Sequence, residues 1–141
     1  MECTVKWLGA EGKSFLAETG SGHLVTMDGA PEAGGRNLAP RPMELLLAGT
    51  GGCTAFDVVM ILQRGRHDVR GCDVKLNATR ADDDPKVFTK IHFQFRVTGR
   101  NLKRETVLRA IELSKEKYCS ASIMLSKTAD ISSELELIEA T

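Results

Sequence analysis

The 141-residue sequence has no excess of charge of either sign and few aromatic residues. Its 19 Lys and Arg residues balance 19 Asp and Glu residues, and Phe, Trp and Tyr together make up 5% of the chain. Nucleic-acid-binding domains carry a basic surface, and single-stranded nucleic acids stack on aromatic side chains. The composition therefore predicts neither a nucleic-acid-binding protein nor one that binds a charged membrane surface.

The sequence also lacks the segments typical of export or membrane insertion. Residues 1–7 alternate as a strand does and contain no basic stretch followed by an apolar run, so we predict no signal peptide. The most apolar region, residues 43–62, is interrupted by three glycines and by Asp57, which favours a buried core helix over a membrane span. We therefore expect a soluble protein of the cytoplasm with no membrane partner.

Closely spaced cysteines and typical metal-binding motifs are absent as well. The chain has no Cys-x-x-Cys pair and no His at the spacing of a zinc ligand, and its four cysteines are Cys3, Cys53, Cys72 and Cys119. Scattered cysteines in a cytoplasmic protein are reduced at rest. We therefore expect no metal and no cofactor, and a single domain over residues 1–141 that folds without a disulfide.

What is present predicts a mixed α+β fold with antiparallel sheets. Alternating apolar and polar residues predict strands, which lie near residues 2–8, 13–19, 22–27, 74–79, 91–97 and 131–137. A Gly- and Pro-rich loop is expected over residues 28–40. A second helix is predicted over residues 103–118, with Val107, Ala110, Ile111 and Tyr118 on one face, and a short helical turn after Cys119. With the last strand, the order is βββ-α-ββ-α-β.

A long helix is predicted over residues 42–64, with Pro42 in its first turn and Gly65 after its end. Its apolar residues occur on every side, so we expect both faces to be covered. Gly49, Gly51 and Gly52 each cost about 1 kcal/mol relative to Ala in a helix interior, which indicates the close approach of another backbone. Either a partner subunit or the protein's own sheet provides that backbone.

A cysteine in the middle of such a helix, as Cys53 is, is by default a small apolar core residue. The same interpretation applies to Cys3, which alternates inward with Val5 and Trp7, and to Cys72, beside the strand that starts near residue 74. His92 falls on the polar side of its strand. We predict it to be a surface residue rather than a catalytic base.

The surroundings of two of the cysteines resemble a known family. Residues 42–53, which end at Cys53, and residues 117–120 around Cys119 resemble the OsmC/Ohr family of osmotically inducible protein C and organic hydroperoxide resistance proteins, closest to its YhfA-like branch. The order of elements matches too, so the resemblance covers nearly the whole chain. It implies the OsmC-like fold, with a central buried helix, and an intertwined homodimer with its sites at the interface.

The resemblance also implies a chemistry. Cys53 is then the peroxidatic thiolate, which attacks the O–O bond of an organic hydroperoxide, and Cys119 resolves the sulfenic acid to a disulfide that a cellular dithiol reduces. The implied function is a thiol-dependent peroxidase. The alternative is a non-catalytic dimer that binds a small molecule in the family cleft. A third possibility is that both cysteines only pack.

Two supporting groups of peroxidase members are missing, which predicts weak activity. Such members have an Arg in the first hairpin and a Glu directly after the Pro that starts the helix, where this chain has Ala10 and Met43. Glu44 comes one residue later and, at about 100° per residue, projects away from Cys53. Without both groups, Cys53 is predicted to be largely protonated at neutral pH.

Two charged residues near these positions have open roles. Asp57 follows Cys53 by one helical turn on the same face, where a carboxylate raises the pKa of the thiol. It either orients a cation or satisfies a buried hydrogen-bond network. Arg36, in the loop over residues 28–40, either supplies the missing positive charge or is a solvated loop side chain.

Overall fold

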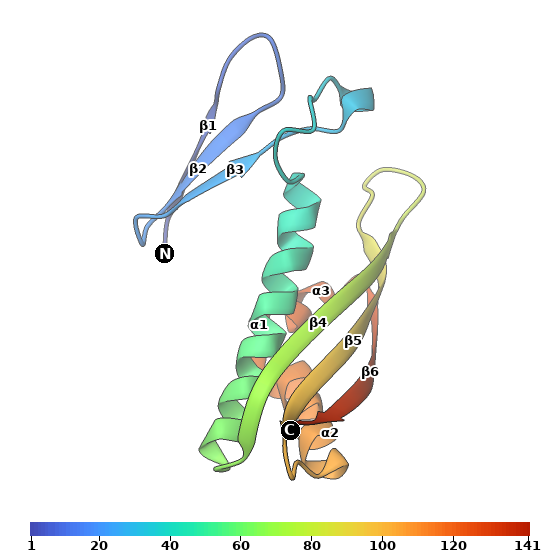
Figure 1. Ribbon diagram of the computed structural model, residues 1–141. Helices are drawn as coiled ribbons and strands as arrows, with labels where there is room; N and C mark the ends of the chain where they lie inside the picture. The colour runs from blue at the N-terminus through green and yellow to red at the C-terminus, as the bar shows by residue number, and fades with distance from the viewer. The chain divides into compact units, whose positions relative to one another are not determined.

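The computed structural model describes all 141 residues, and its contacts divide the chain into two compact units, residues 1–46 and 47–141 (Figure 1). The elements occur in the order that the sequence predicts, and the short helical turn predicted after Cys119 is present as a helix over Ser120–Leu125. The mixed α+β fold is therefore confirmed. The grouping of all residues into one domain stays a prediction.

The first unit holds a three-stranded antiparallel sheet. Its strands are β1 (Cys3–Trp7), β2 (Phe15–Thr19) and β3 (Leu24–Met27), in that spatial order. Every residue of β1 is exposed, including Val5 at 55% and Trp7 at 51%. The prediction that Cys3 points inward is therefore wrong, because this small unit has no second layer of its own to cover β1.

The loop over residues 28–40 is ordered by one carboxylate. Asp28 is buried and accepts the backbone N–H groups of Gly29 at 2.7 Å, Leu38 at 3.0 Å and Arg36 at 3.2 Å. These bonds, led by that from Leu38, lower the pKa of the Asp28 carboxyl. Within the loop, Pro31–Ala33 forms the short 3₁₀ helix η1.

The second unit holds the other sheet, with the order β4-β5-β6. Strands β4 (Asp68–Arg80) and β5 (Phe88–Arg100) are antiparallel, as predicted, and β6 (Asp130–Glu139) runs parallel to β5. Alternate residues of β5 are buried and form much of the core: Phe88, Ile91, Phe93, Phe95 and Val97. Because β4 begins at Asp68, Cys72 lies inside the strand and not before it.

The second predicted helix is divided in two. α2 (Arg104–Leu113) buries Val107, Ala110 and Ile111, as its periodicity predicts, and continues into the π-helical turn η2 (Ser114–Tyr118). The i to i−5 bond from the Cys119 N–H to the Ser114 carbonyl, at 2.8 Å, widens this turn. The extra residue takes Tyr118 out of the buried register. It is 45% exposed, so the prediction that it shares a face with Val107, Ala110 and Ile111 is wrong.

The long helix α1 (Pro42–Arg64) has the predicted bounds. Its buried residues recur every three or four positions and are Thr50, Gly51, Thr54, Asp57, Val58 and Leu62. A Cβ atom at Gly51 would lie 2.7 Å from Leu76 Cδ1, so this glycine lets the helix pack tightly on β4, beside which it runs (Figure 1). The protein's own sheet is therefore the neighbour at Gly51.

The opposite face of α1 is uncovered in this chain. Gly49 and Gly52 would have no atom within 4 Å of an added Cβ, and Phe56 is 68% exposed. By length and mean hydropathy, which is 1.8, α1 also qualifies as a candidate membrane span. Its packed face includes the buried carboxylate of Asp57, as suits a core helix.

Candidate functional site

Folding brings Cys53 and Cys119 together. Cys53 lies in the middle of α1, and Cys119 lies between η2 and the last short helix, α3 (Ser120–Leu125). The two cysteines come within 3.1 Å of each other, and both are free thiols. Cys119 is fully buried, whereas Cys53 is partly exposed. The two cysteines that the sequence singled out therefore form one cluster, and Cys72 lies elsewhere, in β4.

Cys119 sits at the N-cap of α3, where its sulfur meets two hydrogen-bonding groups. Sγ accepts the Ser122 backbone N–H at 3.4 Å and lies 3.2 Å from Thr54 Oγ1. The Thr54 hydroxyl also lies 3.0 Å from the Thr50 carbonyl, to which it can donate. A hydroxyl has one proton, so the Cys119 thiol donates to Thr54 when protonated, and Thr54 can turn its proton to a thiolate.

The two thiols differ in how readily they ionise. Burial raises the pKa of Cys119, but hydrogen bonds from Ser122, Thr54 and Cys53 outweigh it, and the net effect is a lowered pKa. Burial raises the pKa of Cys53, the Ala121 N–H opposes this, and the charges of Cys119 and Asp57 raise it further. When the pair of thiols loses its first proton, the negative charge therefore lies on Cys119. The Cys53 thiol then donates a hydrogen bond to the Cys119 thiolate.

Asp57 belongs to the same cluster. It is 7% exposed, and its Oδ2 accepts the hydroxyl of the fully buried Ser114 at 2.9 Å. One ligand atom from each of Cys53, Asp57 and Cys119 lies within 4.8 Å of the others. Asp57 forms no ion pair with a Lys, Arg or His side chain within 4.0 Å. Of its two predicted roles, the hydrogen-bond network is the one observed.

We expect Ser114→Ala to lower the free energy of unfolding by about 1–3 kcal/mol, because it leaves a buried carboxylate without its hydroxyl donor. Urea unfolding at neutral pH measures the change. Ser126→Ala is the matched control, since the Ser126 hydroxyl is exposed and bonds only the local Ile123 carbonyl. Equal effects of the two substitutions would contradict a buried network at Asp57.

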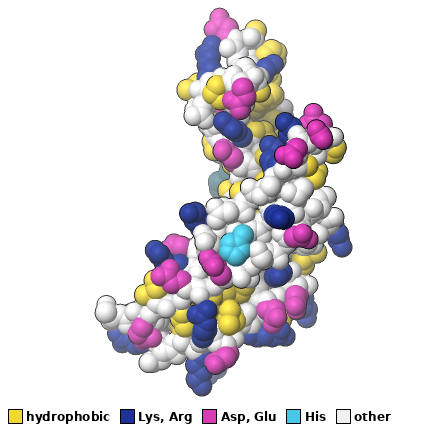
Figure 2. All heavy atoms as spheres, turned by 90° about the vertical axis from the view of Figure 1, so that its right-hand side faces the viewer, with side chains coloured by type: hydrophobic (Ala, Val, Ile, Leu, Met, Phe, Trp, Pro, Cys, Tyr) yellow, Lys and Arg dark blue, Asp and Glu magenta, His cyan; other side chains and the backbone are white.

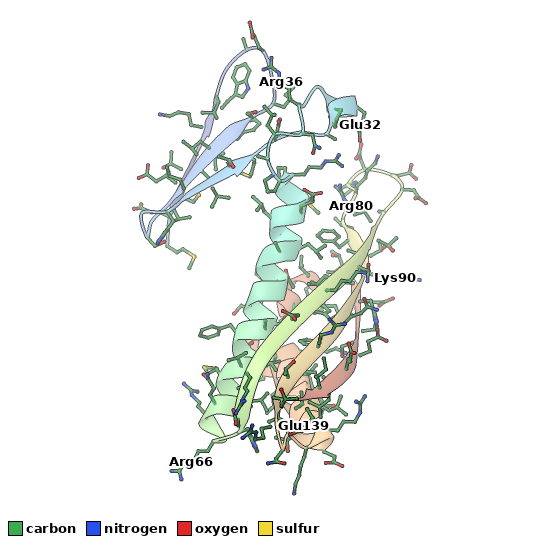
Figure 3. The ribbon with its side chains drawn as sticks, in the orientation of Figure 1. Glu32, Arg36, Arg66, Arg80, Lys90 and Glu139 are labelled. Atoms are coloured by element: carbon green, nitrogen blue, oxygen red, sulfur yellow. The ribbon has the colours of Figure 1, made fainter.

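Arg36, which was considered as a source of the missing positive charge, and Glu44, which was predicted to project away from Cys53, both have other contacts. The Arg36 guanidinium donates to the Glu11 carbonyl at 2.8 Å and pairs with the Glu11 carboxylate at 3.7 Å, which ties it to the β1–β2 loop (Figure 3). The Glu44 carboxylate accepts the Arg41 N–H at 2.9 Å and so caps the start of α1. His92, as predicted, is a polar-side residue, hydrogen-bonded to Ser132.

The cluster includes three residues that the sequence analysis did not single out, namely Thr54, Ser114 and Ser122. Local signals existed for two of them, because Thr54 follows Cys53 directly and Ser122 is three residues after the N-cap Cys119, where a capping side chain finds its N–H donor. Ser114 had none. It reaches Asp57 across 57 positions of sequence, through a π-helical turn that no pattern predicts.

A small cavity adjoins the cluster. Thr54 and Ser122 line it together with side chains of the sheet and α2, and its volume of about 10 Å³ holds roughly one water molecule. A substrate larger than water therefore has to reach Cys53 from outside this cavity. The molecular face shown in Figure 2 carries interspersed Lys, Arg, Asp and Glu side chains, without a dominant charge of one sign.

Comparison with known proteins identifies clear relatives. Residues 34–134 match the family described as OsmC-like protein. Protein YhfA of Escherichia coli K12 is 49% identical over 140 residues, which cover 99% of this chain and all of that protein. A structure from structural genomics superposes with a TM-score of 0.88 at 46% identity, covering 99% of this chain and 100% of its own.

A more distant structure shows the same fold. The organic hydroperoxide resistance protein OhrB of Bacillus subtilis superposes with a TM-score of 0.65, covering 96% of this chain and 98% of its own. Its sequence is 18% identical, so this likeness concerns the fold alone.

Proposed function

Since the chain belongs to the OsmC-like family, we propose that it is a thiol-dependent peroxidase that reduces organic hydroperoxides through Cys53 and Cys119. The observation that supports this best is the approach of two reduced thiols to 3.1 Å. One is buried and hydrogen-bonded, and the other is partly exposed. Such a pair suits a reaction in which the accessible thiol meets the oxidant and the buried one closes the disulfide.

The charge distribution suggests how the reaction begins. The proton of the Cys53 thiol passes to the Cys119 thiolate, which acts as the base. The Cys53 thiolate then attacks the terminal oxygen of the hydroperoxide, and the O–O bond breaks. The alkoxide that leaves takes the proton back from Cys119 and departs as an alcohol, while Cys53 becomes a sulfenic acid.

The second half of the reaction restores a thiol pair. The Cys119 thiolate attacks the Cys53 sulfur, the S–S bond forms and the S–O bond breaks. The hydroxide that leaves takes up from solvent the proton that the thiol pair released when Cys119 ionised, and becomes water. The two cysteines have then given two electrons, and the hydroperoxide has become an alcohol and water. An external dithiol reduces the disulfide by thiol–disulfide exchange. Because burial and neighbouring negative charge raise the pKa of Cys53, we expect slow turnover.

A steady-state assay with a dithiol reductant and an organic hydroperoxide tests the function. We expect consumption of hydroperoxide that stops with Cys53→Ser, while Cys72→Ser is the control that retains activity. The alternative is a small-molecule-binding protein without turnover, favoured by the lack of a cation bonded to either thiol. A wild-type rate no higher than that of Cys53→Ser would support this alternative.

We also propose that the protein is a homodimer. The exposed face of α1 is apolar and contains Gly49, Gly52 and Phe56, as a face that receives another backbone would. Sedimentation at micromolar concentration is expected to give a dimer, and Phe56→Asp is expected to dissociate it. Leu108→Asp, on the exposed side of α2, is the control. A stable wild-type monomer would contradict this proposal.

A further inference from the structure

We propose that Cys53, Asp57 and Cys119 form a binding site for a soft divalent metal ion of the zinc class. One ligand atom from each residue lies within 4.8 Å of the other two. Cys53 and Asp57 are one turn apart on the buried face of α1, and Cys119 comes from the turn before α3. This site lies beyond the proposed peroxidase reaction and does not depend on it.

The three ligand atoms reach one coordination shell after movements of roughly 1 Å, in which the two sulfurs move apart and an oxygen–sulfur separation of up to 4.8 Å closes. At bond lengths of about 2.3 Å to sulfur and about 2.1 Å to oxygen, tetrahedral ligand atoms lie roughly 3.5–3.8 Å apart. The two cysteines are now 3.1 Å apart. Binding therefore requires the two sulfur atoms to separate by less than roughly 1 Å, which small side-chain rotations provide.

Two of the three ligands already have a hydrogen-bond donor that orients them. Ser114 donates its hydroxyl to Asp57 Oδ2, and the Ser122 N–H is directed at Cys119 Sγ. At Cys53 the Ala121 backbone N–H acts to lower the pKa of the thiol, which favours the thiolate. In metal sites such outer groups hold carboxylate and thiolate ligands in place.

The charge balance of the cluster also favours a cation. Two thiols and a carboxylate share a largely buried space, and Asp57 has no cationic partner within ion-pair distance. Burying unpaired negative charge is costly. A divalent ion that replaces the two thiol protons leaves the net charge of the cluster at −1, and it gives the Asp57 carboxylate the positively charged neighbour that it lacks. Thiolates select zinc and its soft relatives over magnesium and calcium, and three protein ligands leave a fourth position open.

Metal and hydroperoxide would compete for the same sulfur atoms. A bound ion withdraws both thiolates from attack on an O–O bond, and a disulfide offers the ion only the carboxylate. The reduced protein therefore binds the metal and the oxidised protein does not. In the same way, metal occupancy protects both cysteines from alkylation and oxidation.

Titration of the reduced protein with Co²⁺, followed by displacement with Zn²⁺, tests the site. A variant lacking Cys3 and Cys72 serves as the starting protein, so that only the two clustered thiols remain. We expect one Co²⁺ per chain with a thiolate-to-cobalt charge-transfer band, lost on addition of Zn²⁺. Cys53→Ser and Cys119→Ser are each expected to abolish the band.

Asp57→Asn is the decisive variant. It should weaken Zn²⁺ binding, measured against a chromogenic chelator, by roughly tenfold or more, since even outer-shell changes cost 10–100-fold. The same variant retains both thiols and should still form the disulfide with hydroperoxide, so failure of the metal site is distinguishable from failure of the peroxidase proposal. Ser114→Ala should weaken binding less, which provides a second variant if Asp57→Asn does not fold.

Three results would overturn the site. The first is no Co²⁺ or Zn²⁺ binding at micromolar concentration by the reduced starting protein. The second is a charge-transfer band that persists in Cys53→Ser. The third is unchanged Zn²⁺ affinity in both Asp57→Asn and Ser114→Ala, which would leave only chelation by two neighbouring thiols.

Discussion

One equivalent of an organic hydroperoxide is expected to convert the reduced protein to a form with a single disulfide, between Cys53 and Cys119. The two cysteines are 3.1 Å apart, so the S–S bond of about 2.05 Å requires a movement of roughly 1 Å. The other two thiols have no such partner. Cys3 lies in the sheet of the first unit, and burial together with Asp73 raises the pKa of Cys72 to about 11.

Peptide mapping of the oxidised protein measures the pairing. Cys53→Ser and Cys119→Ser should each abolish the bridge completely, whereas Cys3→Ser and Cys72→Ser should leave it intact. A bridge that survives either of the first two substitutions would show that the pairing is wrong. A disulfide that forms only between chains would likewise contradict the contact on which the proposal depends.

The same variants decide which cysteine reacts first. In Cys119→Ser, a sulfenic acid should accumulate on Cys53 and be trapped by a nucleophilic probe. In Cys53→Ser, the fully buried Cys119 should remain a thiol. The reverse labelling pattern would assign the attack to Cys119, whose pKa is the lower of the two.

The sequence predicted the long helix and the pair of cysteines for different reasons. The bounds of α1 follow from local rules, with Pro42 in the first turn and Gly65 after its last residue. The pairing of Cys53 with Cys119 came from the resemblance to a family and not from spacing, because 65 residues of sheet and helix lie between them. Contacts of this range depend on the whole topology.

The errors share a physical cause. Period-two alternation at Cys3, Val5 and Trp7 predicts a face for the strand but not the presence of a second layer to cover it. Tyr118 fits a regular helix, and only the π-helical turn moves it outward. The expectation of no metal is a separate matter, which measured metal binding at the proposed site would overturn; it rested on the absence of closely spaced cysteines. Residues from separate elements can converge all the same, as Cys53, Asp57 and Cys119 do.

Glycine gave an ambiguous signal for a similar reason. Three glycines in one turn predicted close packing without naming the neighbour. Gly51 packs on Leu76 of the same chain, whereas a Cβ atom added at Gly49 or Gly52 would contact no other element within 4 Å. The group of three glycines thus reflects contact with the protein's own sheet at Gly51. At the other two it is consistent with the proposed subunit contact.

The reactivity of Cys53 is expected to rise steeply with pH, and Asp57→Asn is expected to increase it several-fold at neutral pH. A negative charge beside a thiol stabilises the protonated form, so the Asp57 carboxylate adds to the effect of burial and raises the pKa of Cys53. Below that raised pKa the thiolate fraction increases tenfold for each pH unit. Removing the carboxylate lowers the pKa and moves the profile to lower pH.

Alkylation of Cys53 across a pH series, quantified by mass spectrometry, measures this shift. The protein lacks Cys3 and Cys72, keeps Cys119 and is treated with a chelator, so that no bound metal masks the thiols. Glu44→Gln is the matched control, because it removes one carboxylate charge from the same helix at a residue that caps its start. Coinciding profiles of Asp57→Asn and the unsubstituted protein would mean that burial and Cys119 alone set the pKa of Cys53.

The pH profile of hydroperoxide consumption should shift together with the pH profile of alkylation if the Cys53 thiolate is the attacking group. A shift in alkylation without one in turnover would place the slow step after the attack, at closure or reduction of the disulfide.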